Sequence, residues 1–306
     1  MWPVLSLLLL APLVGEYVLG NIPVSALPAL VVLAGMYGGG AVLIREVARR
    51  TGRGWPAILV LGLAYGVLEA GLLDQSLFNP DFEGHRFLEV TPVPALGISA
   101  VNALAFVVGH AVWSIGVPIA LVESAARPGP WLGRTGLVVC ALVFAGGSAL
   151  VFRSLLRTEG FLATPAQRVG AALTVVALVL AALPLRPRPP VDRRVPRPRV
   201  VGVGAFLLSS LFVLMPDDWT GFALKVGWLV VAAALGLWFG RGARWGAGHR
   251  FAAAAGTLVT YTWLGWFLVE KSPGPLVAHG VLIALTWALL VVLGLRAGSS
   301  GTRPCA

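Results

Sequence analysis

A glutamate stands inside an apolar segment near the start of this chain. Glu69 lies in residues 65–81, YGVLEAGLLDQSLFNPD, an apolar stretch that runs into a polar, proline-terminated loop. A carboxylate within a membrane costs several kcal/mol unless it is paired or protonated, so such a residue marks a functional site by default. The next question is which side chains lie at the same depth as Glu69.

Four polar side chains from three other apolar segments are predicted at similar depth. Glu16 and Asn102 fall in the outer third of their segments, His110 near the middle, and His279 about one turn inside the outer boundary. Asn102 and His110 also share one helical face, with Phe106 between them at four-residue spacing. We therefore predict Glu69, His110 and His279 as the catalytic set, with Asn102 and Glu16 as supporting or substrate-binding residues.

A buried glutamate beside histidine suits acid–base chemistry. Burial shifts such a carboxyl toward the working pH, as a general base requires, and a histidine can share its proton or stabilise developing charge. Water would be activated directly by Glu69, or through a metal held by Glu69, His110 and His279. The sequence leaves both routes open, and it leaves the metal and any cofactor unknown.

Each of these residues also has a plainer interpretation. A lone membrane histidine or asparagine more often forms an interhelical hydrogen bond than a catalytic group. Glu16, near the interface, is about as well explained by snorkelling. Asp74 and Gln75 at the mouth of the third segment would contact substrate or support the site; together with Asn79 they are better explained by helix capping and a turn.

Composition places the chain in a membrane. Of its 306 residues, 58% are hydrophobic and only 12% are charged, whereas soluble domains carry about 25% charged residues. We predict an all-α, polytopic helical bundle with ten transmembrane helices. Their ranges are approximately 3–20, 27–44, 55–73, 95–122, 136–152, 165–183, 200–215, 222–240, 251–269 and 275–295.

The positive charge is an orientation signal. With both termini in the cytoplasm, all but six of the 23 basic residues fall on the inner side; the exceptions are Arg86, Arg153, Arg157, Arg168, Lys225 and Lys271. This bias predicts a multi-pass protein of a bacterial-type inner or plasma membrane. Membrane lipid is the expected partner, a peptide or small molecule the candidate substrate, and no nucleic acid is expected.

One linker divides the chain. Residues 184–199, PLRPRPPVDRRVPRPR, contain too many prolines for a continuous helix and enough arginines to stay in the cytoplasm. They separate a six-helix part, residues 1–183, from a four-helix part with a short C-terminal tail, residues 200–306. The first segment lacks a basic leader and is expected to be retained as a span. Cys140 and Cys305 form no disulfide or metal pattern.

Glycine pairs at four-residue spacing predict close helix contacts in three spans. The pairs are Gly35 and Gly39, Gly62 and Gly66, and Gly236 and Gly240. In the third span this stripe continues through Ala70, within a turn of Glu69. The Glu69 side chain is therefore expected to face protein or a cavity.

A second group of polar residues follows in the outer loop. Asp81, Glu83, His85 and Glu89 are close in sequence and carry the oxygen and imidazole ligands that metal ions use. Such a charged loop is more often simply solvated. The cation site is a minor hypothesis.

The membrane polar residues also fall in three short motifs, Tyr65-Gly66-x-x-Glu69, Phe106-x-x-x-His110 and Pro275-Leu-Val-Ala-His279. Their order on separate helices resembles the CAAX-prenyl-protease and bacteriocin-processing (CPBP) family of intramembrane glutamate proteases. The resemblance implies that Glu69 is the general base on water, and that His110 and His279 orient that water or stabilise the oxyanion. Where the family has a second glutamate, an arginine and an asparagine, this chain has Ala70, Asp74 and Ile283.

Two other functions remain open. Ten spans with both ends cytoplasmic resemble the drug/metabolite transporter superfamily in topology, and Glu69 would then be a proton or substrate site. Alternatively, the polar residues hold together a non-catalytic membrane scaffold. The hydrolase hypothesis requires Glu69, His110 and His279 to meet.

Overall fold

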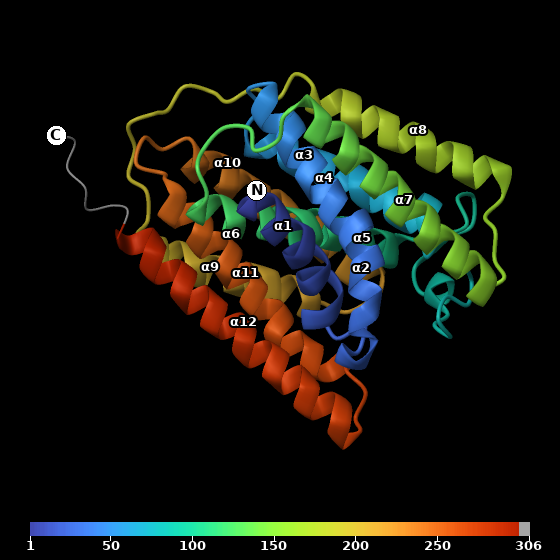
Figure 1. Cartoon of the computed structure of the whole chain (residues 1–306). Helices are drawn as coiled ribbons and strands as arrows, with labels where there is room; N and C mark the ends of the chain where they lie inside the picture. The colour runs from blue at the N-terminus through green and yellow to red at the C-terminus, as the bar shows by residue number, and fades with distance from the viewer. Residues whose placement is uncertain (300–306) are drawn as a thin grey trace.

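The computed structural model describes residues 1–299, which form an all-α helical bundle (Figure 1). The tail from residue 300, with Cys305, lies outside the described residues. The helices begin and end as follows: α1 Trp2–Pro12, η1 Leu13–Val18, η2 Val24–Ala29, α2 Leu30–Leu33, η3 Ala34–Gly38, α3 Gly39–Arg50, α4 Trp55–Leu68, η4 Glu69–Leu73, η5 Phe87–Glu89, α5 Ala100–Gly109, η6 His110–Gly116, α6 Val117–Ala125, α7 Arg134–Thr158, α8 Pro165–Ala182, α9 Pro198–Leu214, α10 Trp219–Gly240, α11 Ala247–Leu268 and α12 Pro273–Ser299. The strands β1 Pro92–Val93 and β2 Ile98–Ser99 form an antiparallel pair in the 74–99 loop.

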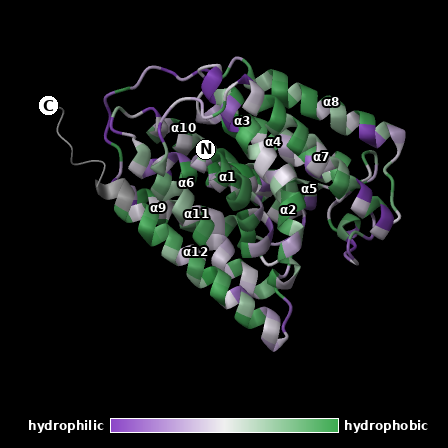
Figure 2. Cartoon of the chain, in the orientation of Figure 1, coloured by the Kyte–Doolittle hydropathy of each residue, from purple (hydrophilic) through white to green (hydrophobic). Residues whose placement is uncertain are grey.

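The predicted helical bundle is confirmed. Joined end to end, these elements make ten apolar helical segments within residues 1–299, and eight of them have the length and composition to cross a membrane. The other two, Trp2–Val18 and Pro198–Leu214, are shorter apolar helices. The helix bodies are hydrophobic, and the hydrophilic residues gather in the loops and at helix ends (Figure 2). This distribution is that of a multi-pass membrane protein.

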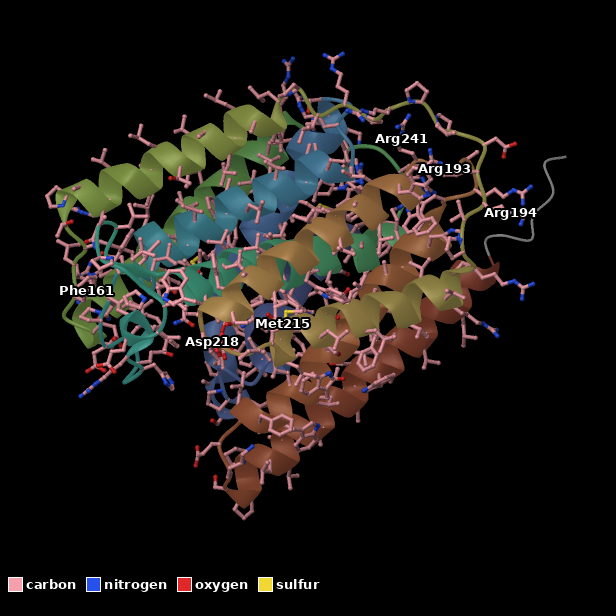
Figure 3. All side chains as sticks on the ribbon, turned by 180° about the vertical axis from the view of Figure 1, so that it is seen from behind. Phe161, Arg193, Arg194, Met215, Asp218 and Arg241 are labelled. Atoms are coloured by element: carbon pink, nitrogen blue, oxygen red, sulfur yellow. The ribbon has the colours of Figure 1, made fainter. Side chains whose placement is uncertain are left out.

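The two ends of the bundle carry different segments. Arg193 and Arg194 of the linker and Arg241 after α10 lie together at one end, and Phe161 in the α7–α8 connection lies at the other (Figure 3). The linker is tied to the α10–α11 connection by a bridge between Val191 and Gly242. We call the Phe161 end, which also holds residues 74–99, the predicted outer end.

Aromatic packing joins the helices on either side of the linker. Trp113 stacks on Tyr261 of α11 with ring centroids 4.5 Å apart and planes 1° apart. Its indole N–H donates to the carbonyl of Thr257 at 3.0 Å. Among the helices that follow the linker, Ser209 and Ser210 of α9 both lie within hydrogen-bond distance of Thr260 of α11, at 2.6 and 3.0 Å.

Two of the three predicted glycine contacts are confirmed. A Cβ on Gly35 would lie 3.2 Å from Gly147 of α7, and one on Gly66 would lie 2.7 Å from the Val107 carbonyl oxygen of α5. The prediction for α10 is wrong, because no described atom lies within 4 Å of a Cβ placed on Gly236 or Gly240. The spacing recurs in helices that face lipid, where nothing packs against it.

The α4–α5 contact can be tested by adding one methyl group. We expect Gly66→Ala to force α4 away from Val107 and lower the free energy of unfolding by about 1–3 kcal/mol, as overpacking does. Gly236→Ala meets open space and gains helix propensity, so it should not destabilise the protein. The measurement is thermal unfolding of the purified variants in detergent, and equal melting temperatures would contradict the close packing at Gly66.

Candidate functional site

Four polar side chains from the first four membrane segments meet within the bundle. His110 Nε2 lies 2.9 Å from Glu69 Oε2, an ion-pair distance. The Tyr37 hydroxyl lies 2.5 Å from Glu16 Oε1, 3.0 Å from Glu69 Oε1 and 3.3 Å from His110 Nε2. Tyr37 is therefore the centre of a cluster formed by Glu16, Tyr37, Glu69 and His110, which we call the tyrosine-centred cluster.

Each member of this cluster lies in a π-helical turn. Glu16 lies in η1, Tyr37 in η3, Glu69 begins η4 and His110 begins η6. These four are the π-helical turns found within residues 1–299. A π turn inserts an extra residue into an α-helix and changes the direction of the side chains beside it. Such turns are rare in proteins overall, and those that occur are often found at functional sites. Their coincidence with all four residues supports a shared function.

Small residues allow the four helices to approach. A Cβ on Gly66 would meet the Val107 backbone and lie 3.2 Å from His110 Cβ, so glycine there lets Glu69 and His110 face each other across a narrow gap. Beside Glu16, a Cβ on Gly15 would lie 2.7 Å from Ser114 Oγ and 3.6 Å from the Tyr37 ring. The absence of these side chains brings η1, η3 and η6 together.

The orientation of His110 is set by its own helix. Its Nδ1 lies 2.7 Å from the carbonyl oxygen of Phe106, one turn earlier. A carbonyl only accepts hydrogen bonds, so Nδ1 carries the proton, and Nε2 is left to face Glu69 and Tyr37. The four-residue spacing of Phe106 and His110 thus has a mechanical reason.

The contacts constrain where the protons of the cluster lie. The Tyr37 hydroxyl lies within hydrogen-bond distance of Glu16 Oε1 and of Glu69 Oε1, and each of these two contacts requires a proton between its two oxygens. Tyr37 supplies one of these protons, and the other must lie on Glu16 or Glu69. A further proton on His110 Nε2, which lies at ion-pair distance from Glu69, makes the cluster electrically neutral, which a membrane interior favours. In every such arrangement at least one carboxyl is protonated.

One edge of the cluster is partly exposed. The His110 side chain is 15% exposed while that of Glu69 is 4% exposed, and the Asn21 side chain donates to the second Glu16 oxygen at 3.4 Å at this exposed edge. Glu69 Oε2 has no hydrogen bond of good geometry among the described residues. The Glu69 oxygen that faces His110, Oε2, is therefore free to accept a hydrogen bond from a further polar group.

His279 does not join Glu69 and His110. Its ring is buried against Trp266, edge to face with centroids 5.3 Å apart, and neither ring nitrogen lies within ion-pair distance of Glu69. Gly265 of α11 gives the ring its space, since a Cβ there would lie 2.7 Å from His279 Nε2. The sequence predicts His279 at a membrane depth similar to that of Glu69, but the rotation of α12 about its axis directs the side chain at Trp266.

The supporting residues divide similarly. Glu16 is a direct member of the cluster through Tyr37. Asn102 instead donates to the Phe87 carbonyl and to Ser99 Oγ, both at 3.0 Å, and thereby fixes the start of α5. Asp74 accepts from the Ser76 N–H at 2.9 Å in a turn.

Gln75 has a structural contact as well. Its backbone has a positive φ of 62°, and its side-chain oxygen accepts from the Ala163 N–H at 2.7 Å. This bond connects the turn after η4 to the α7–α8 connection. The turn-forming interpretation accounts for what Asp74 and Gln75 contact.

The outer-loop residues do not converge as a set. Glu89 pairs with Arg86 at 3.4 Å, His85 stacks on Phe87, and the Glu83 N–H donates to Glu159. Burial, with the Glu159 charge nearby, raises the pKa of Glu83. Throughout residues 1–299 no group of three or more His, Cys, Asp or Glu side chains has the geometry of a metal site, Glu69, His110 and His279 included.

None of three comparisons, with protein-family models, curated proteins and solved structures, finds a match to this chain. The geometry of the cluster is therefore the basis for any functional assignment.

Sequence reasoning missed Tyr37, the residue that links the other three. Its signal was weak but present, because Tyr37 is a buried phenol inside the glycine-rich run GMYGGG, residues 35–40. The sequence also gave no pairing for Arg45 and Glu46, which are buried at the opposite end of the bundle. Arg45 bonds Glu46 at 2.6 Å and Glu123 at 2.9 Å, and its guanidinium lies 3.6 Å from the Trp131 ring centre.

The proton count is open to infrared spectroscopy. We expect the wild-type protein at neutral pH to show a protonated-carboxyl band that shifts in heavy water, and the double variant Glu16→Gln, Glu69→Gln to lose part of it. The difference spectrum isolates the cluster from other carboxyls. Glu89→Gln, at a side chain 69% exposed, is the matched control and should leave the band unchanged. Identical spectra for wild type and double variant would contradict the shared-proton cluster.

Proposed function

We propose that this multi-pass membrane protein is an intramembrane hydrolase in which Glu69 is the general base and His110 its partner. The observation that carries the proposal is the 2.9 Å contact between these two side chains, which lie in two π-helical turns, with His110 partly exposed at one edge. Positioned acid–base groups of this kind contribute about 10²–10⁴-fold to reaction rates.

The chemistry follows from the positions of the four groups. Glu69 takes a proton from water as the water oxygen bonds to the substrate carbonyl carbon. In the arrangement that leaves Glu69 ionised, Glu16 carries the carboxyl proton and His110 is protonated on both nitrogens. His110 Nε2, with Nδ1 fixed on Phe106, and the Tyr37 hydroxyl are then the donors available to the oxyanion. The proton held by Glu69 then passes to the leaving group as the bond to the carbonyl carbon breaks. Glu16 keeps Tyr37 aimed at the site.

Of the three residues that the resemblance to CPBP proteases assigns to the site, Glu69 and His110 lie together and His279 lies apart. Glu69 and His110 meet as that family's chemistry requires, whereas His279 lies against Trp266. Tyr37 and Glu16 stand in the cluster in its place. We therefore propose glutamate–histidine hydrolysis with tyrosine as the additional donor.

One observation favours a second candidate, a proton-coupled transporter. Hydrogen-bond contacts of the Tyr37 hydroxyl with Glu16, Glu69 and His110 form a continuous polar path that joins four membrane segments. Such chains also serve as proton relays in transporters. The two functions differ in a measurable product.

The test uses isotope incorporation, which detects hydrolysis of any carbonyl substrate in the mixture. Wild-type protein in liposomes containing a total membrane lipid and lipoprotein extract is incubated in ¹⁸O-labelled water. We expect ¹⁸O to enter product carboxyl groups, and Glu69→Gln or His110→Gln to lower the rate by about 10²–10⁴-fold. Glu270→Gln, exposed on the predicted outer side, should retain the wild-type rate.

A parallel assay with a pH-sensitive dye inside the same liposomes measures proton flux. Proton flux that is lost in Glu69→Gln, without any isotope incorporation by the wild type, would replace the hydrolase proposal with the transporter. Isotope incorporation that persists in Glu69→Gln would refute the assigned base.

A further inference from the structure

An apolar pocket adjoins the tyrosine-centred cluster. It lies among α3, α4, α7 and α8 and has a volume of about 160 Å³. Leu61 and Leu68 mark its extent along α4, Phe144 comes from α7 and Val175 from α8. The pocket lies where α8 packs mainly against α4 and α7 packs mainly against α3 and η3.

Tyr65 forms a wall shared by the pocket and the cluster. It lines the pocket, and its ring centroid lies 5.9 Å from Tyr37 and 6.1 Å from His110. Tyr65 is 3% exposed, and its hydroxyl has no hydrogen-bond partner among residues 1–299. A buried hydroxyl left without a partner costs about 1–3 kcal/mol, so it has bonding capacity for a molecule that comes to this boundary.

The lining determines what can occupy the pocket. Apart from the Tyr65 hydroxyl, the side chains that line it are apolar, and a water molecule needs two to four polar partners to be stable inside a protein. The pocket also lies within membrane-spanning segments, where hydrocarbon is the surrounding medium. A hydrocarbon chain is the occupant that fits both conditions.

Direction along the membrane supports the same occupant. From Leu61 to Leu68 the pocket follows α4 for about 10 Å, and Leu68 directly precedes Glu69. A chain in this pocket therefore has one end within a turn of the cluster and the other toward the middle of the span. A lipid of the predicted outer leaflet has this orientation, with its head group outward and its chain toward the bilayer centre.

We propose that the substrate is an acyl-chain amphiphile whose chain occupies this pocket and whose polar head group reaches Glu69 and His110. This inference rests on the proposed hydrolase function and adds the substrate class. Tyr65 separates chain from head group, and its hydroxyl is the first polar atom that the head group meets.

The test fills the pocket and leaves the cluster intact. Val175 lines the pocket, whereas its neighbour Val176 is 53% exposed on the outside of α8. Val175→Trp and Val176→Trp therefore make the same chemical change on two different faces of one helix, one lining the pocket and one exposed. Ala64→Trp fills the pocket from α4 and serves as a second variant if Val175→Trp does not fold.

The probe is a phosphatidylglycerol with a photoactivatable diazirine on its acyl chain, in vesicles that carry the full-length protein. After illumination, mass spectrometry measures labelling of the peptide that contains residues 61–68. We expect Val175→Trp and Ala64→Trp to lower this labelling by about tenfold, the loss expected when roughly two methylene groups can no longer be buried. Val176→Trp should label like the wild type.

The outcomes separate this inference from the function on which it rests. Labelling that is equal in wild type, Val175→Trp and Ala64→Trp would overturn the chain pocket, even if ¹⁸O incorporation depends on Glu69. Labelling that persists in Glu69→Gln, while hydrolysis is lost, supports both assignments. Pocket-specific labelling with no Glu69-dependent hydrolysis would leave a lipid-binding pocket and overturn the substrate assignment.

Discussion

The constraint on which the structure depends is that two carboxyls and an imidazole inside a membrane must not carry uncompensated charge. Sharing protons through a tyrosine meets that constraint, because Tyr37 bonds both carboxyls, and one protonated carboxyl together with a protonated His110 beside Glu69 leaves no net charge. The arrangement works only if Glu16, Tyr37, Glu69 and His110 come from four helices that touch. Close helix contact is therefore a requirement of the site as well as of the fold.

The helices meet this requirement by giving up regular geometry. A regular α-helix aims side chains at intervals fixed by its 3.6-residue turn, and four such helices do not in general direct one polar group each at a common point. A π turn at each polar residue shifts that direction. Gly15 and Gly66 then remove the side chains that would hold the backbones apart. Irregular backbone and small residues thus act together.

The sequence predicts some of this and misses the rest for identifiable reasons. Hydropathy marks all ten apolar segments, and eight of them have the length and composition that lipid imposes on a span. Depth along a helix follows from residue number, so Glu69 and His110 were matched correctly. Rotation about the helix axis does not follow from depth, and in the regular helix α12 it directs His279 at Trp266. Tyr37 was overlooked since a tyrosine in a membrane helix carries no charge to mark it.

Charge at the opposite end of the bundle has a different logic. Arg45 and Glu46 are buried there with the partly buried Glu123, in bonds of 2.6 and 2.9 Å. The arginine count used to predict the orientation includes Arg45 as a positive charge at the membrane edge. In the structure the guanidinium of Arg45 is instead paired with Glu46 and Glu123 inside the protein. Breaking a buried pair leaves an uncompensated charge and is strongly unfavourable, so this network holds α3 against α6 firmly. Because α3 continues directly from η3, which carries Tyr37, fixing α3 at its C-terminal end also restricts the position of Tyr37.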